Sequence, residues 1–140
     1  MTVLIDTNII LDILMKRIPF YETSNTVLSY CVSEKLKGYI ALHSVSNIYY
    51  ILRKHFSAED RRKLLLGMLD LLQIANATHE GVKRALARND FSDFEDCLQD
   101  ECARRVFADY IITRNMDDFT KSQIPAVTPE DFIQKFNLQK

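Results

Sequence analysis

The sequence predicts an α/β fold, in which helices cover both faces of a central parallel sheet of about four to five strands. Short apolar runs that suit buried strands alternate with longer segments whose apolar residues recur at helical spacing. The connections between the runs are long enough for the crossovers that parallel pairing requires. We therefore expect a three-layer α/β/α sandwich.

The predicted strands are short and mostly apolar. Val3-Leu4-Ile5 and Tyr110-Ile111-Ile112 have the composition of strands that are buried on both faces. Further strands are expected at residues 39–42, 73–75 and 126–127.

Capping residues predict where the helices begin and end. A helix over residues 22–37 is expected to end at Gly38, a residue typical of the C-cap region. Ser92 and Glu95 have the spacing of a capping box, so another helix is expected from there to about residue 105. Further N-caps are predicted at Asp6, Ser44, Ser57, Thr78 and Thr128.

Length and composition limit the class of protein. The 140 residues are expected to form one domain, residues 1–140, and 3 Gly and 3 Pro leave no segment that resembles a linker. A net charge of -1 argues against a protein that coats nucleic acid through charge alone. Cys31, Cys97 and Cys102 are interpreted as core residues. With no signal peptide or membrane span in the sequence, we expect a cytoplasmic protein.

Acidic residues gather at three places along the chain. Asp6 follows the first strand, and Asp118 follows the strand at residues 110–112. Between them, Asp93, Asp96 and Asp100 are spaced to share one face of a helix. Each group also has an ordinary explanation: a helix N-cap for Asp6, complementation of the helix dipole for the middle group, and a solvated turn for the last.

A metal site would explain the three groups together. The carboxyl ends of parallel strands form the usual ligand edge of such a sheet, so Asp6, Asp96 and Asp118 are predicted to converge there. Carboxylates are the preferred protein ligands of Mg²⁺ and Mn²⁺. Such ions can activate water for phosphodiester hydrolysis.

Several motifs of this chain resemble those of PIN domains. They are Asp6-Thr7-Asn8, Asp93-Phe94-Glu95-Asp96, Thr113-Arg114-Asn115, Asp118-Phe119 and the segment 127–132. The resemblance implies a parallel-sheet fold and an endoribonuclease that cleaves single-stranded RNA with Mg²⁺ or Mn²⁺. Small proteins of this kind resemble VapC-type toxins, so a cognate antitoxin and a homodimer are also implied.

The resemblance implies a role for each matching residue. Asp6, Asp96 and Asp118 would bind metal and form the catalytic group. Asp93, Thr113 and Asn115 would support them. Arg114 lies within the third motif and is predicted to contact substrate.

One position departs from the family pattern. PIN domains usually have a glutamate in the helix after the second strand, where this chain has Asn47. An amide has no charge, so the substitution should weaken metal binding, and we expect Asn47 to have hydrogen-bonding partners near the buried face of its helix. A PIN-like domain that has lost activity and only binds RNA or protein is therefore the main alternative.

A phosphoryl-transfer enzyme or a receiver domain is a third interpretation. An enzyme of the haloacid-dehalogenase type should have a second Asp where this chain has Asn8, and a receiver domain should have Lys after a late strand, where this chain has Thr113-Arg114. The histidines have no metal-like spacing: His43, His55 and His79.

Overall fold

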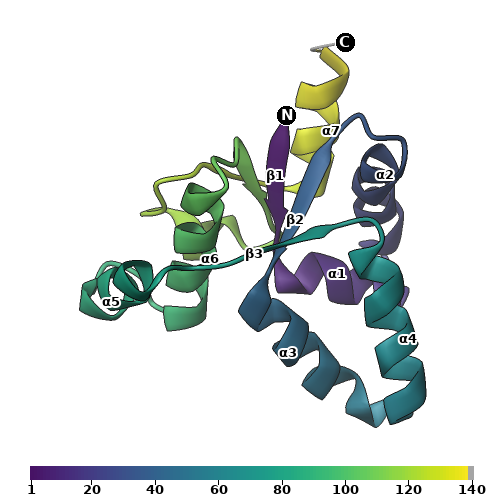
Figure 1. Cartoon of the computed structure of the whole chain (residues 1–140). Helices are drawn as coiled ribbons and strands as arrows, with labels where there is room; N and C mark the ends of the chain where they lie inside the picture. The colour runs from purple at the N-terminus through teal and green to yellow at the C-terminus, as the bar shows by residue number, and fades with distance from the viewer. Residues whose placement is uncertain (139–140) are drawn as a thin grey trace.

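The computed structural model describes residues 1–138. Within them lie five strands and seven α-helices, with two short 3₁₀ helices, η1 and η2 (Figure 1). In chain order these are β1 (Thr2–Ile5), α1 (Thr7–Leu14), α2 (Tyr21–Val32), β2 (Lys37–Ala41), α3 (Leu42–Ile51), η1 (Leu52–Lys54), α4 (Ala58–Leu69), β3 (Gln73–Ala75), α5 (His79–Ala87), α6 (Phe94–Arg105), β4 (Tyr110–Ile112), η2 (Met116–Phe119), β5 (Ala126–Val127) and α7 (Pro129–Leu138).

The five strands form one parallel sheet with the order β3-β2-β1-β4-β5. The predicted parallel sheet of about four to five strands is therefore confirmed. In the register of β1 and β4, Ile5 lies opposite Ile112. The residues that follow these two strands are consequently neighbours at the carboxyl edge of the sheet.

Helices cover both faces of this sheet, as predicted. Val3 and Ile5 of β1 belong to a core that also contains buried residues of α1, α2, α3, α4 and α7. Leu4 faces the opposite way and packs in a second core with Cys102 and Ala103 of α6. Figure 1 shows α5 and α6 on one side of the sheet and α1, α2 and α4 on the other. Successive side chains of β1 therefore point to opposite faces of the sheet, and the helices packed on each face complete the three layers.

The helix predicted over residues 22–37 is too long. In the structure, α2 ends at Val32, and Gly38 lies inside β2 instead of capping the helix. Glu34 turns the chain with a φ of 61°. Gly38 is needed for another reason, because a Cβ there would lie 2.6 Å from Leu72 and 2.7 Å from Cys31. The glycine thus allows α2 and the chain before β3 to approach β2 closely.

Two predicted N-caps are wrong. Helix α3 begins at Leu42, so Ser44 lies within the helix, fully buried. Helix α6 is capped by Asp93 and not by Ser92, since the Asp93 carboxylate accepts a hydrogen bond from the Glu95 N–H at 2.7 Å. Three other N-caps are confirmed by hydrogen bonds to the side chain: Ser57, Thr78 and Thr128.

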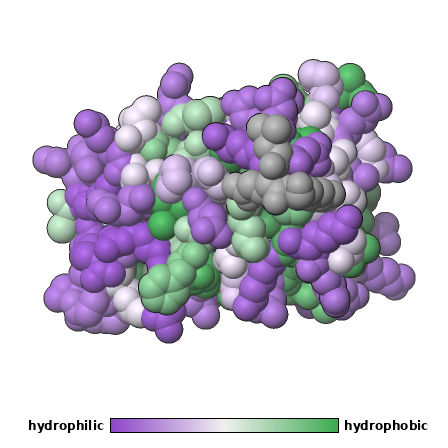
Figure 2. All heavy atoms as spheres, turned by 90° about the horizontal axis from the view of Figure 1, so that it is seen from above, coloured by the Kyte–Doolittle hydropathy of each residue, from purple (hydrophilic) through white to green (hydrophobic). Residues whose placement is uncertain are grey.

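The surface is mainly hydrophilic at the end of the molecule where β1 begins. Seen from above in Figure 2, hydrophilic residues cover most of this face, with smaller hydrophobic areas between them.

Cys31, Cys97 and Cys102 are free and buried, which confirms their interpretation as core residues. Within residues 1–138, no helix is both long enough and apolar enough to cross a bilayer.

Candidate active site

Asp6 lies at the carboxyl edge of the sheet, between β1 and β4. Its backbone N–H donates to the carbonyl of Ile112 at 3.0 Å, which continues the strand pairing for one more residue. The carboxylate is almost fully buried and accepts hydrogen bonds from the Thr113 hydroxyl at 2.8 Å and from the Thr7 N–H at 2.7 Å. Asp6 also begins α1 as its N-cap, as predicted. The neighbouring strand and helix thus hold this carboxylate in one orientation.

A buried polar network surrounds Asp6. The Gln99 side-chain amide of α6 donates to Asp6 Oδ1 at 3.3 Å and to the Ser44 hydroxyl at 2.9 Å. The Thr7 hydroxyl also donates to Ser44, at 2.7 Å. Gln99 was missed in the sequence, although it follows Asp96 by three residues and therefore lies on the same face of α6. Its amide connects α6 to α1 and α3 beneath the site.

An acidic cavity of about 470 Å³ opens above this network. Five carboxylates line it, and none of the described residues that line it is a lysine or an arginine. The predicted residues Asp6, Asp96 and Asp118 are all among them, from three separate elements. The lining residues are Asp6, Thr7, Asn8, Asn47, Tyr50, Ile51, Asp93, Glu95, Asp96, Gln99, Asn115 and Asp118.

The carboxylates repel one another in the absence of a cation. Burial and the nearby charges of Asp6, Asp93 and Asp118 raise the pKa of Asp96 to about 7. Burial also raises the pKa of Asp6, against the opposing effect of its hydrogen bond from Thr113. The Asp118 charge raises it further. A cation in this cavity would relieve the repulsion that raises both pKa values.

The supporting residues of the sequence prediction lie at three places around the cavity. Thr113 is fully buried, and its hydroxyl both donates to Asp6 and accepts from the Asn115 N–H at 3.0 Å. Asp93 is the N-cap of α6. Asn47 is half-buried in α3 and lines the cavity, but its amide has no hydrogen bond to any residue of the described chain, so the expected partners are not found. Its amide oxygen is free to face a cation or water.

The chemistry of these side chains fits a hard divalent cation. Carboxylate and amide oxygens surround the cavity, which suits Mg²⁺ or Mn²⁺ and not a soft metal that prefers sulfur. Across residues 1–138, no three His, Cys, Asp or Glu side chains already stand close enough to form a ligand cluster. Mg²⁺ needs no such cluster, because it is usually held by one or two carboxylates with water completing its coordination.

Arg114 does not line the acidic cavity, although its charge acts to lower the pKa of Asp6. Its guanidinium forms two hydrogen bonds with the carboxylate of Asp12 in α1, at 2.6 and 3.2 Å. Asp12 is fully buried, and the Phe20 ring lies 4.1 Å from the guanidinium carbon. Arg114 therefore ties the segment after β4 to α1. The prediction that it contacts substrate stays a prediction.

Only part of the acidic face of α6 belongs to the cavity. Asp93 and Asp96 line it, whereas Asp100 is fully buried and forms an ion pair with Arg88 at 3.0 Å. The Asp100 carboxylate also accepts hydrogen bonds from the backbone N–H groups of Gln123 and Ile124. The i, i+7 spacing thus placed Asp100 near the same face of α6 as Asp93, but the positive charge of Arg88 already neutralises its carboxylate.

The chain belongs to the PIN-domain family, whose sequence model matches residues 2–117. This match confirms the resemblance seen in the motifs of the sequence. A search of curated proteins finds no match.

Solved structures share the fold at low sequence identity. The chain is similar to VapBC2 from Rickettsia felis bound to promoter DNA, with 17% identity over 91% of this chain and 98% of the other, at a TM-score of 0.69. It is similar to a toxin–antitoxin complex from Klebsiella pneumoniae, with 23% identity over 91% and 97% of the two chains, at a TM-score of 0.68. It is also similar to VapC20 from Mycobacterium tuberculosis, a toxin that cleaves the sarcin–ricin loop, with 12% identity over 78% and 86% of the chains, at a TM-score of 0.61.

Proposed function

We propose that the protein is a divalent-metal-dependent endoribonuclease that cleaves single-stranded RNA and acts as the toxin of a toxin–antitoxin pair. The observation that supports this most is the cavity with five carboxylates and no lining lysine or arginine, at the carboxyl edge of a PIN-domain sheet. Among the structural neighbours, VapC20 is a toxin that cleaves the sarcin–ricin loop, and the Klebsiella pneumoniae structure is a toxin–antitoxin complex.

The residues at the cavity divide into metal ligands and positioning residues in this proposal. Asp6, Asp96 and Asp118 would hold Mg²⁺ or Mn²⁺, with Asp93 and Asn115 beside them. Bound there, the ion would supply an activated water and stabilise the charge that develops on the phosphate. Thr113 and Gln99 keep the Asp6 carboxylate oriented through their hydrogen bonds, so it would not have to reorganise when the ion binds.

The rim of the cavity offers contacts for RNA. Tyr50 is 61% exposed, and the Arg53 guanidinium carbon lies 3.6 Å from the centre of its ring. An exposed aromatic ring suits stacking with a base, and an adjacent guanidinium suits a phosphate. Tyr50 and Arg53 therefore supply at the mouth of the cavity the positive and aromatic groups that its acidic floor lacks.

Cleavage of labelled single-stranded RNA tests this proposal. Purified protein should cleave with Mg²⁺ or Mn²⁺ and not with chelator, and Asp6→Asn or Asp96→Asn should each abolish cleavage. Asp117→Asn is the matched control, because Asp117 is exposed next to Asp118 and does not line the cavity. Cleavage that persists in both variants, or in chelator, would contradict the proposal.

Asn47 favours a second candidate function, that of a PIN-domain protein which binds RNA or protein without cutting. The amide stands where the family usually has a carboxylate, so the cavity has one negative charge fewer near the metal. If wild-type protein does not cleave, Asn47→Glu should restore metal-dependent cleavage under the main proposal. A wild type and an Asn47→Glu variant that are both silent, yet bind RNA, would support the second function.

We place the antitoxin on an apolar groove between α3 and α4. Leu42, Val45 and Tyr49 lie along one face of α3 and line a cavity of about 470 Å³ together with His43, Ser46 and Leu65. Arg61 lies over the Tyr49 ring at 4.2 Å, so the groove has a basic rim. An antitoxin segment that is both apolar and acidic would fit it.

Co-expression with the product of a small adjacent reading frame tests this partner. The two chains should co-elute in gel filtration, and Leu42→Asp should separate them. Leu86→Asp on α5 is the control: both leucines are more than half exposed, but only Leu42 lines the groove, so Leu86→Asp should leave the complex intact. Co-elution that Leu42→Asp leaves intact would contradict the placement. Homodimerisation stays a prediction of the family resemblance, and a cytoplasmic location stays a prediction of the sequence.

A further inference from the structure

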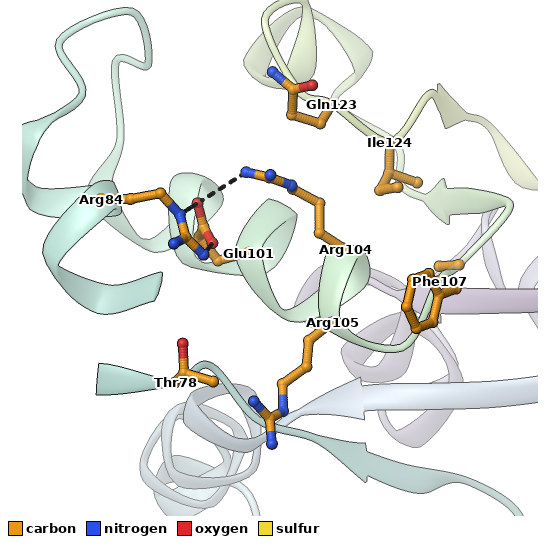
Figure 3. Close-up of a pocket in the computed structure, with 9 residues that line it drawn as sticks. Thr78, Arg84, Glu101, Arg104, Arg105, Phe107, Gln123 and Ile124 are labelled. Carbon is orange, nitrogen blue, oxygen red and sulfur yellow. Dashed lines mark hydrogen bonds and ion pairs between the residues drawn. The ribbon is translucent and has the colours of Figure 1, made fainter. Parts of the chain in front are cut away.

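A basic pocket lies at the ends of α6 and β4 that are opposite to the acidic cavity. Its volume is about 640 Å³, and the residues that line it are drawn in Figure 3. The pocket is built where α6 ends and β4 has not yet begun, whereas the acidic cavity lies where β4 ends. Three arginines and one carboxylate line it. The lining residues are Thr78, Arg84, Glu101, Arg104, Arg105, Phe107, Ala108, Gln123 and Ile124.

Two of the arginines are held in place by Glu101. This carboxylate is buried, and it accepts hydrogen bonds from Arg84 at 3.0 and 3.4 Å and from Arg104 at 3.3 Å. A guanidinium has five N–H donors, so each arginine retains donors for an anion. Figure 3 shows Arg84 and Arg104 converging on Glu101, while Arg105 extends separately from the end of the helix.

Positive charge in the pocket therefore exceeds negative charge. Arg105 is exposed and forms no ion pair with any residue of the described chain. With Glu101 balancing one of the two guanidiniums that it holds, the lining keeps a surplus of two positive charges. Arginines that are fixed in position lose less freedom on binding a phosphate than mobile ones do.

Phe107 is the least expected residue of this pocket. It follows α6 with a φ of 55°, a left-handed conformation that favours glycine. Its N–H donates to Arg104 O and the next N–H donates to Ala103 O, the two hydrogen bonds of a Schellman motif. The Phe107 side chain is 87% exposed, so burial of the ring does not offset this conformation. A ring that gains nothing from packing is available to a ligand.

We propose that the basic pocket is an exosite for single-stranded RNA, in which Arg84, Arg104 and Arg105 contact phosphates and Phe107 stacks on a base. This inference rests on the proposed function for the nature of its ligand. Fixed cations beside an exposed ring are the elements that single-strand binders combine. The position of the pocket, at the opposite end of β4, means that it would hold RNA away from the bond to be cut.

RNA binding without cleavage tests the exosite directly. The full chain, in chelator, is titrated into labelled single-stranded RNA of about 20 nucleotides and followed by fluorescence anisotropy. Phe107→Gly should weaken binding by about fivefold or more, the range expected for one lost base stack. Arg105→Gln should lower the slope of log affinity against log salt by about 0.7, the value for one phosphate contact on a single strand.

The controls separate binding from folding. Phe107→Gly suits the left-handed backbone better, so its thermal midpoint should equal or exceed that of wild type while its affinity for RNA falls. Lys35→Gln and Leu66→Ala remove an exposed charge and an exposed apolar side chain that do not line the pocket, and should leave binding unchanged. Unchanged affinity in Phe107→Gly and Arg105→Gln would overturn the exosite, and would make an acidic protein the better candidate ligand.

The two proposals fail in different ways. If cleavage is absent but the Phe107 and Arg105 variants still weaken RNA binding, the exosite stands and the nuclease proposal fails. If the protein cleaves, Phe107→Gly should raise KM for a long RNA with little change in kcat, and should not affect an RNA of a few nucleotides. Equal kinetic effects on long and short RNA would contradict an exosite.

Discussion

Asp96→Asn should stabilise the metal-free protein while abolishing its proposed activity. Asp96 lies near Asp6, Asp93 and Asp118 in a cavity whose described lining offers no lysine or arginine, and these charges together with burial raise its pKa from 3.8 to about 7. The charged form of Asp96 is therefore less favourable in the folded state than in the unfolded chain. Replacing it with the neutral, similarly shaped asparagine removes that penalty.

The magnitude follows from the pKa. A rise of about three pKa units at about 1.4 kcal/mol each sets a ceiling near 4 kcal/mol on the gain in free energy of unfolding. Because Asp96 is only half-buried, solvent screens much of the repulsion, and we expect about 1–2 kcal/mol at pH 8 and low salt.

The stability gained by Asp96→Asn should be larger at high pH than at low pH. The folded state binds the proton of Asp96 more tightly than the unfolded state, so the wild type gains stability from this group as the pH falls from about 7 toward 4. The advantage of Asp96→Asn should therefore be complete above about pH 7 and lost by about pH 4, where Asp96 is protonated in both states.

Urea denaturation in chelator measures this advantage. Wild type and Asp96→Asn are compared at pH 8 and pH 4.5, with Asp117→Asn as the control that should stay within about 0.5 kcal/mol of wild type. A variant that is less stable than wild type at pH 8, or an advantage that does not shrink at low pH, would refute the view that the carboxylates repel one another in this cavity.

Three further changes test other parts of the structure. Arg114→Leu should lower the free energy of unfolding by about 2 kcal/mol in urea denaturation, because the fully buried Asp12 loses its bidentate partner and keeps only the longer ion pair with Arg17, at 3.6 Å. A change below about 1 kcal/mol would show that Arg114 is not needed to neutralise Asp12. Gly38→Ala should destabilise by about 1–3 kcal/mol in the same assay, since the new Cβ would lie 2.6 Å from a neighbouring side chain, and a neutral effect would show that this region repacks. Gln99→Leu should cost about 1–3 kcal/mol and also weaken Mn²⁺ binding, because the Asp6 carboxylate loses a donor; normal metal affinity in a folded variant would exclude a role in positioning Asp6.

Local patterns predicted the sheet and the general place of the site. Short apolar runs located all five strands to within two residues. For β1 and β4 the reason is that a strand buried on both faces requires a continuous apolar run, whereas β3 is exposed at Gln73 and Ile74. Strand ends then placed Asp6 and Thr113 at one edge, where the register puts them side by side. These features depend only on neighbours in sequence and on the general geometry of parallel sheets.

Contacts between distant segments could not be predicted in the same way. Asp12 and Arg114 pair across 102 positions, and Asp100 of α6 pairs with Arg88, the residue that follows α5. Nothing in the local sequence distinguishes these charges from those that line the cavity. The spacing on α6 therefore included Asp100 with Asp96, although only Asp96 faces the site.

Helix ends were predicted least well where tertiary contacts override local preference. A glycine after a helical segment is typical of a C-cap, but Gly38 is required within β2 because Leu72 and Cys31 pack against it. Ser44 has the chemistry of an N-cap, but its hydroxyl accepts hydrogen bonds from Thr7 and Gln99 inside the molecule. In both cases the residue has a place in packing that only the folded chain defines.

Direct titration with Mn²⁺ tests the central claim that the acidic cavity is a metal site. Calorimetry on chelator-treated wild-type protein should show binding that EDTA reverses, and Asp96→Asn should weaken it by at least about tenfold, since the variant loses one of the three carboxylates that would hold the ion. Asn47→Glu should tighten binding, and Asp117→Asn should leave it unchanged. Wild-type protein that binds no Mn²⁺, or binds it equally well after Asp96→Asn, would contradict the account.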